Sequence, residues 1–191
     1  MLAVRFISPR YFAFDKNIQR AQDVLAVVEH VPYPFDPGCE VHADVVLDGM
    51  CYSAVGTAPG PCVLKGNYKP NPCRNCELGE EFVLVPVYNP AAARDFLEAA
   101  SEVKTMRYSI PFWDFMEPNV ILKYTDPDVD CDNPKSWRTM FCSQFALLFL
   151  RYCHKHGIIA IRNPIPLYEC NSHVCSPAHL RKIMQAAFDY K

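Results

Sequence analysis

Apolar residues recur at the spacing of one helix face in four stretches of the chain. Proline stands at the first turn of the second and fourth stretches, where its fixed backbone angle suits a helix start. Ser176 precedes the fourth as an N-cap, and Gly157 follows the third, which is the most apolar. The pattern predicts helices at residues 17–28, 90–103, 143–156 and 177–188.

Strand signals lie between the first two of these helices. Residues 41–47 and 50–55 flank Asp48-Gly49, a dipeptide typical of two-residue hairpin turns. A short apolar stretch at 62–64 and the run EEFVLVPV at 80–87 predict two further strands. Because the strands are grouped rather than alternating with helices, we expect an α+β fold with an antiparallel sheet, not a parallel α/β fold.

Length and composition narrow the class of protein. The 191 residues suit one domain, spanning 1–191 with its core at about 18–188, and half of them are hydrophobic, which argues against disorder. A net charge of -2 gives no electrostatic reason to expect a nucleic-acid partner. No apolar run approaches the roughly 20 residues of a membrane span. The first residues are too short an apolar stretch for a signal peptide, so we expect a soluble, cytoplasmic protein without a transmembrane segment.

The ten cysteines allow two uses besides catalysis. Without an export signal, reduced thiols are expected rather than a disulfide framework. Cys73 and Cys76 have the C-x₂-C spacing that places two thiolates on one zinc ion, and Cys170, His173 and Cys175 form a second group. A zinc-stabilised binding module without catalysis is therefore one alternative, whereas thiol chemistry itself requires no cofactor.

Cys142 is the candidate nucleophile because it stands at the start of the most apolar helix. A thiol there experiences the positive end of the helix dipole, which favours the thiolate. Backbone N–H groups at the same end, around Ser143, can stabilise an oxyanion. Considered alone, Cys142 is better explained as one of ten cysteines that serve as small core residues.

His42 is the candidate base, and strand alternation puts it on one face with Asp44. Two polar side chains then occupy positions where a core residue is expected. A nucleophilic thiol needs a neighbouring imidazole, and that imidazole needs a third group to orient it. Asp44 can orient it from the same strand, and Tyr52 or Ser53 can do so from the returning strand of the hairpin.

Five motifs in order connect these candidates, namely HADVVLDGMCYSAVG, IPFWDF, FCSQF, HKHGI and SPAHL. In this order they resemble the circularly permuted branch of the NlpC/P60 superfamily, found in bacteria and large DNA viruses. That resemblance implies a papain-like fold in which the histidine strand precedes the cysteine helix. It also implies a thiol hydrolase that forms an acyl-enzyme from a peptide, another amide or an acyl-lipid, with Cys142 as nucleophile and His42 as base.

The resemblance leaves several positions open. Many relatives carry a polar residue on the strand after the histidine, where this chain has Met50-Cys51-Tyr52-Ser53. Asp44 is therefore our first choice of orienting residue and Ser53 the second. Gln144 is expected to support the site or cap the helix, while Trp113 either lines an acyl pocket or belongs to the core. A catalytically inactive binding module of the same fold is the alternative function.

Overall fold

The computed structural model describes most of the sheet and the C-terminal helices. The described residues are 1–7, 42–55, 62–68, 80–108 and 130–188. The helix predicted at 17–28, the Cys73–Cys76 pair and Trp113 lie outside these ranges.

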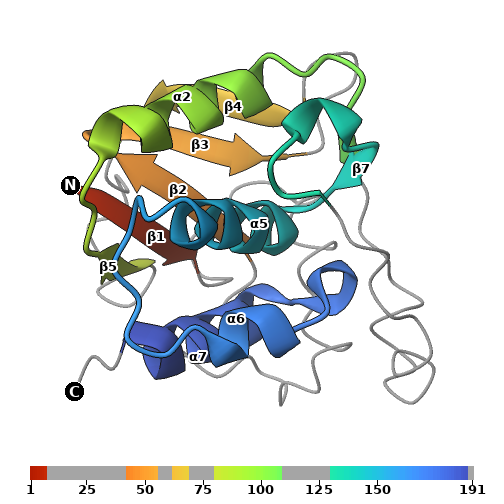
Figure 1. Ribbon diagram of the computed structural model, residues 1–191. Helices are drawn as coiled ribbons and strands as arrows, with labels where there is room; N and C mark the ends of the chain where they lie inside the picture. Colours follow the sequence, from red (N-terminus) through yellow and green to blue (C-terminus); the bar gives the residue numbers. More distant parts are fainter. Residues whose placement is uncertain (8–41, 56–61, 69–79, 109–129, 189–191) are drawn as a thin grey trace.

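Five antiparallel strands form one sheet with the order β4-β3-β2-β1-β5 (Figure 1). Their bounds are Leu2–Ile7 for β1, His42–Leu47 for β2, Met50–Ala54 for β3, Val63–Asn67 for β4 and Glu80–Val85 for β5. The first strand thus lies inside the sheet, between β2 and β5. In that register Arg5 stands directly opposite Asp44.

The β2–β3 hairpin follows from its turn residues. Asp48 has φ 49° and Gly49 has φ 80°, and positive φ at both central positions is what a type I′ turn requires. The twist of such a turn matches that of the strands that it joins. The hairpin pairs Val45 with Tyr52 on one face of the sheet. Because side chains alternate along a strand, Ser53 and Asp44 lie beside each other on the other face.

Four helices and several short elements complete the described fold. The helices are α2 (Pro90–Ser101), α5 (Cys142–Lys155), α6 (Ile165–Glu169) and α7 (Pro177–Phe188). The short elements are β6 (Arg107–Tyr108), β7 (Thr139–Met140) and the 3₁₀ turns η2 (Pro134–Ser136) and η3 (Ser172–Val174). Strands β6 and β7 pair in parallel, so the segment just before α5 is tied to the end of the segment that follows α2.

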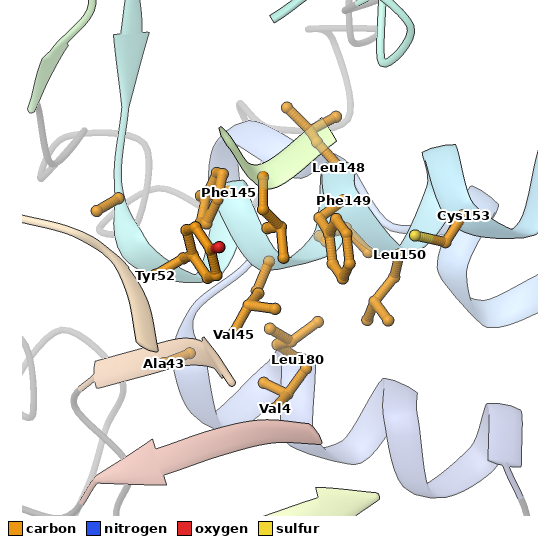
Figure 2. Close-up of a cluster of buried hydrophobic side chains, with 14 of the residues drawn as sticks. Val4, Ala43, Val45, Tyr52, Phe145, Leu148, Phe149, Leu150, Cys153 and Leu180 are labelled. Atoms are coloured by element: carbon orange, nitrogen blue, oxygen red, sulfur yellow. The ribbon is translucent and has the colours of Figure 1, made fainter. Parts of the chain in front are cut away.

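Helix α5 forms the centre of the core. Its first nine residues are all buried, and it packs between α2 and the α6–α7 pair against one face of the sheet (Figure 1). Phe145 and Phe149 lie among Val4 and Val45 from the strands, with Leu180 of α7 nearby (Figure 2). Because this part of the helix is buried on every side, it is held rigidly, and the position of its first residue is well determined.

The observed elements confirm the expected α+β class. The helices predicted at 90–103, 143–156 and 177–188 and the predicted strands occur within a few residues of their expected bounds, and β4 extends further, to Asn67. Strand β1 and helix α6 were not predicted. Among the described residues, no helix has the length and apolar character that crossing a membrane requires.

Candidate active site

Cys142 is the first residue of α5 and only 3% exposed. Phe141 before it has extended backbone, with φ -127° and ψ 170°, and its side chain makes no capping hydrogen bond. The amides of the first helical turn therefore receive no acceptor from the N-cap side chain. The backbone N–H of Ala43, on β2, reaches the Cys142 sulfur instead and stabilises its thiolate form.

His42 begins β2 and places its imidazole between the thiol and two polar groups. One side hydrogen-bonds Cys142. On the other side, His42 Nε2 lies 2.7 Å from Asp44 Oδ1 and 2.8 Å from Ser53 Oγ. The structure thus brings both orienting candidates, Asp44 and Ser53, to the same ring nitrogen.

The pKa values of the thiol and the imidazole move in opposite directions. Burial raises the pKa of Cys142, but the His42 charge, the His42 hydrogen bond and the Ala43 amide outweigh burial and lower it overall. Burial lowers the pKa of His42, but the negative charges of Asp44 and Cys142 outweigh it and raise it well above its usual value. Both shifts favour the charged pair, thiolate and imidazolium, over the neutral one.

Asp44 is 1% exposed and is held by a cation on the neighbouring strand. Arg5 donates from Nε to Asp44 Oδ2 at 2.9 Å, and a second guanidinium nitrogen bonds the same oxygen. Burial raises the pKa of this carboxyl, but His42, Arg5 and the Ser53 hydroxyl hold it well below its usual range. Asp44 is therefore a charged group at every pH at which the thiolate forms.

Tyr108 is a site residue that the sequence analysis missed. It ends β6, and its hydroxyl hydrogen-bonds the Cys142 sulfur. Burial, together with the Cys142 charge and this hydrogen bond, raises the pKa of Tyr108 well above its usual value, so the phenol stays protonated. No spacing rule marks this tyrosine, because it reaches the thiol only through the pairing of β6 with β7.

Ser143 and Gln144 attach the start of α5 to the segment around η3. The Ser143 hydroxyl donates to the Cys175 carbonyl at 2.5 Å, and Gln144 Nε2 lies 3.2 Å from His173 Nδ1. Both side chains are buried. Both side chains thus join the start of α5 to the η3 segment, whereas the oxyanion role expected of Ser143 would depend on its backbone amide.

The remaining candidates, Tyr52 and the described cysteines considered as zinc ligands, make other hydrogen bonds. Tyr52 donates to Glu98 Oε1 at 2.7 Å, which directs its hydroxyl to α2. Cys170 and Cys175 hydrogen-bond each other, and burial together with this contact raises the pKa of Cys175. Within the described ranges, no three His, Cys, Asp or Glu side chains are grouped so as to hold a metal ion.

No family model, curated protein or solved structure matches the chain. What the protein does is therefore inferred from its own residues.

Proposed function

We propose that the protein is a cysteine hydrolase that forms an acyl-enzyme on Cys142, with His42 as the base. The observation that carries this proposal is the series Cys142–His42–Asp44, in which His42 hydrogen-bonds Cys142 and lies 2.7 Å from Asp44 Oδ1, and in which each group shifts the pKa of the next. A structural core cysteine has no need of an imidazole and a carboxylate in a row. Perturbed pKa values combined with this order of contacts are typical of catalytic sites. The resemblance to permuted NlpC/P60 proteins points to the same reaction and to a papain-like fold.

In the first step the Cys142 thiolate attacks the carbonyl carbon of an amide, ester or thioester. The new S–C bond pushes the carbonyl electrons onto oxygen, to which the amides at the start of α5 can donate, as can the Tyr108 hydroxyl once the sulfur no longer accepts its hydrogen bond. The carbonyl then re-forms as the bond from its carbon to the leaving nitrogen, oxygen or sulfur breaks, the His42 imidazolium gives its proton to that leaving atom, and the acyl group stays on Cys142.

In the second step water attacks the Cys142 thioester while His42 accepts its proton. The S–C bond breaks, the acid product leaves, and the thiolate–imidazolium pair is restored. Asp44 and Ser53 keep the same ring nitrogen of His42 hydrogen-bonded throughout, so the other nitrogen faces the thiol. A peptide, another amide or an acyl-lipid all provide the carbonyl that this chemistry needs.

The burial of Cys142 favours a second candidate, an inactive binding module of the same fold. A thiol that substrates do not reach has no catalytic use even when it is ionised. Reactivity toward a small electrophile separates the two candidates, since it requires both ionisation and access.

The test is the alkylation rate of each cysteine against pH, with iodoacetamide and a mass-spectrometric readout. At pH 7 an ordinary thiol is only about 3% thiolate, so we expect Cys142 to react roughly tenfold faster than such a thiol. The advantage should vanish in His42→Ala. Cys153 is the internal control, because it is buried and burial raises its pKa. If Cys142 in the unmodified protein is as inert as Cys153, the hydrolase is refuted and the binding module remains.

A further inference from the structure

We propose that Arg5 is a positioning residue for this site: it binds one oxygen of Asp44, leaves the other oxygen to His42, and balances the negative charge of the buried groups. The inference rests on the proposed function, because it concerns how the same thiol is activated. Arg5 belongs to β1 and lies outside the five sequence motifs described above.

The geometry divides the carboxylate between two cations. Asp44 Oδ2 receives Arg5 Nε at 2.9 Å and a second nitrogen of the same guanidinium. Asp44 Oδ1 lies 2.7 Å from His42 Nε2. Because the guanidinium is a rigid planar fork, its two bonds to Oδ2 fix the position of that oxygen. The rotation of the carboxylate is then set by Oδ1, which stays available to the imidazole.

Arg5 is itself held in place, so it acts as a fixed charge rather than a mobile surface cation. Its side chain is only 11% exposed. A guanidinium nitrogen lies 3.5 Å from Cys51 Sγ on β3, and the guanidinium carbon lies 5.4 Å from the centre of the Tyr68 ring. Contacts from β2, β3 and the residue after β4 therefore surround it, and the arrangement is formed before any substrate binds.

The charges alternate along the site. In the active form Cys142 is negative, His42 positive, Asp44 negative and Arg5 positive, so the four sum to zero. Other titratable groups in the described ranges also face this row. Hydrogen bonds join Cys51 of β3 to Arg5 and Tyr108 of β6 to Cys142. The thiols of Cys62 and Cys175 also interact with Cys142, and burial raises the pKa of both, so they stay neutral.

Without Arg5 the buried row carries one uncompensated negative charge. If Asp44 stays ionised, that charge opposes formation of the Cys142 thiolate. If Asp44 instead takes up a proton, His42 loses the charge that stabilises its imidazolium, and with it the thiolate loses its counter-ion. Both responses make Cys142 harder to ionise, whereas a purely structural role for Arg5 predicts no change in the pH at which the thiolate forms.

The experiment is the pH profile of Cys142 alkylation in Arg5→Met, Arg5→Lys, Asp44→Asn and the double variant Arg5→Met/Asp44→Asn. We expect Arg5→Met to move the midpoint of the profile upward by on the order of one pH unit. Arg5→Lys keeps the charge, so its midpoint should lie close to that of the unmodified protein. Its rate of Cys142 alkylation should still be lower. The double variant should match Asp44→Asn, because Arg5 acts through Asp44.

The controls separate this inference from the proposed function. Arg94→Met removes a comparable arginine, which bonds Asp48 Oδ2 at 2.7 Å on the hairpin, and should leave the profile unchanged. If Cys142 shows elevated reactivity and Arg5→Met has the same profile as the unmodified protein, the role of Arg5 is refuted and the hydrolase stands. If Cys142 shows no elevated reactivity, both fail. If Arg5→Met does not fold, the double variant, which removes both charges, is compared with Asp44→Asn. Slower alkylation of Cys142 in the double variant than in Asp44→Asn overturns the inference.

Discussion

Replacing Tyr52 with phenylalanine distinguishes two uses of this residue: bracing the sheet against α2 or assisting chemistry at Cys142. The sequence left the second use open, because Tyr52 stands on the strand next to His42. In the fold its ring is buried in the core and its hydroxyl donates to Glu98 Oε1 at 2.7 Å. We therefore expect Tyr52→Phe to lower stability and to leave the reactivity of Cys142 unchanged.

The magnitude follows from what the substitution removes. The ring stays, so the loss is one hydrogen bond to a charged acceptor, which typically contributes about 1.5–3 kcal/mol. The Glu98 side chain is 32% exposed and keeps its ion pair with Lys65, so water can replace the hydroxyl in part. We expect a loss near the lower limit, about 1.5 kcal/mol, which corresponds to roughly 3–6 °C in Tm for a domain of this size.

The effect should also depend on pH with a definite sign. The hydrogen bonds from Lys65 and Tyr52 lower the pKa of Glu98 in the folded state. A carboxyl whose folded pKa is lowered adds stability above its unfolded value of about 4.3, and this stability is lost as the pH falls through the folded pKa. The difference between Tyr52→Phe and the unmodified protein should therefore be largest near neutral pH and shrink on acidification.

Urea unfolding at neutral and acidic pH measures the stability, and iodoacetamide alkylation measures Cys142. Tyr88→Phe is the matched control, because Tyr88 is exposed and its hydroxyl should contribute nothing comparable. A variant of unchanged stability whose Cys142 reacts much more slowly would refute this reasoning and return Tyr52 to the active site.

Two further predictions concern the site and the core. Asp44→Asn should slow alkylation of Cys142 more than Ser53→Ala does, because Asp44 supplies a charge as well as a hydrogen bond to His42. The reverse order of rates, measured under the same conditions, would make Ser53 the main orienting group. Phe149→Ala should lower the free energy of unfolding by about 3–5 kcal/mol in urea, because the ring is fully buried at the centre of α5, and a loss below about 1 kcal/mol would mean that the core closes around the cavity.

Local patterns were sufficient for the parts of this fold that form from neighbouring residues. Turn residues predict the hairpin at Asp48-Gly49, and caps and hydrophobic periodicity predict the helices α2, α5 and α7. The same patterns placed Cys142 at a helix start and set His42 and Asp44 on one strand face. They left open whether Asp44 or Ser53 orients His42, because that depends on the hairpin register; the structure sets both within hydrogen-bonding distance of one nitrogen.

The parts that were missed depend on contacts between distant residues. Strand β1 has only six residues and is apolar on both faces except at Arg5, so it lacks the alternation that marks a strand with one exposed face. A strand inside a sheet is defined by its partners, and those of β1 come some forty and eighty residues later along the chain. Arg5 and Tyr108 could not be assigned to the site for the same reason, since each reaches it through a pairing of strands.

The order of elements along the chain has a consequence for how the protein is made. All five strands, and with them Arg5, His42, Asp44 and Ser53, precede Cys142 in the sequence. Ribosomes add roughly 5–20 residues per second, so several seconds pass between the synthesis of β5 and that of α5. A newly made Cys142 has an ordinary thiol pKa of about 8.5 until α5 docks on the sheet. A nascent or truncated chain in which α5 has not docked therefore carries an ordinary thiol, and the lowered pKa of Cys142 arises only when α5 packs against the sheet.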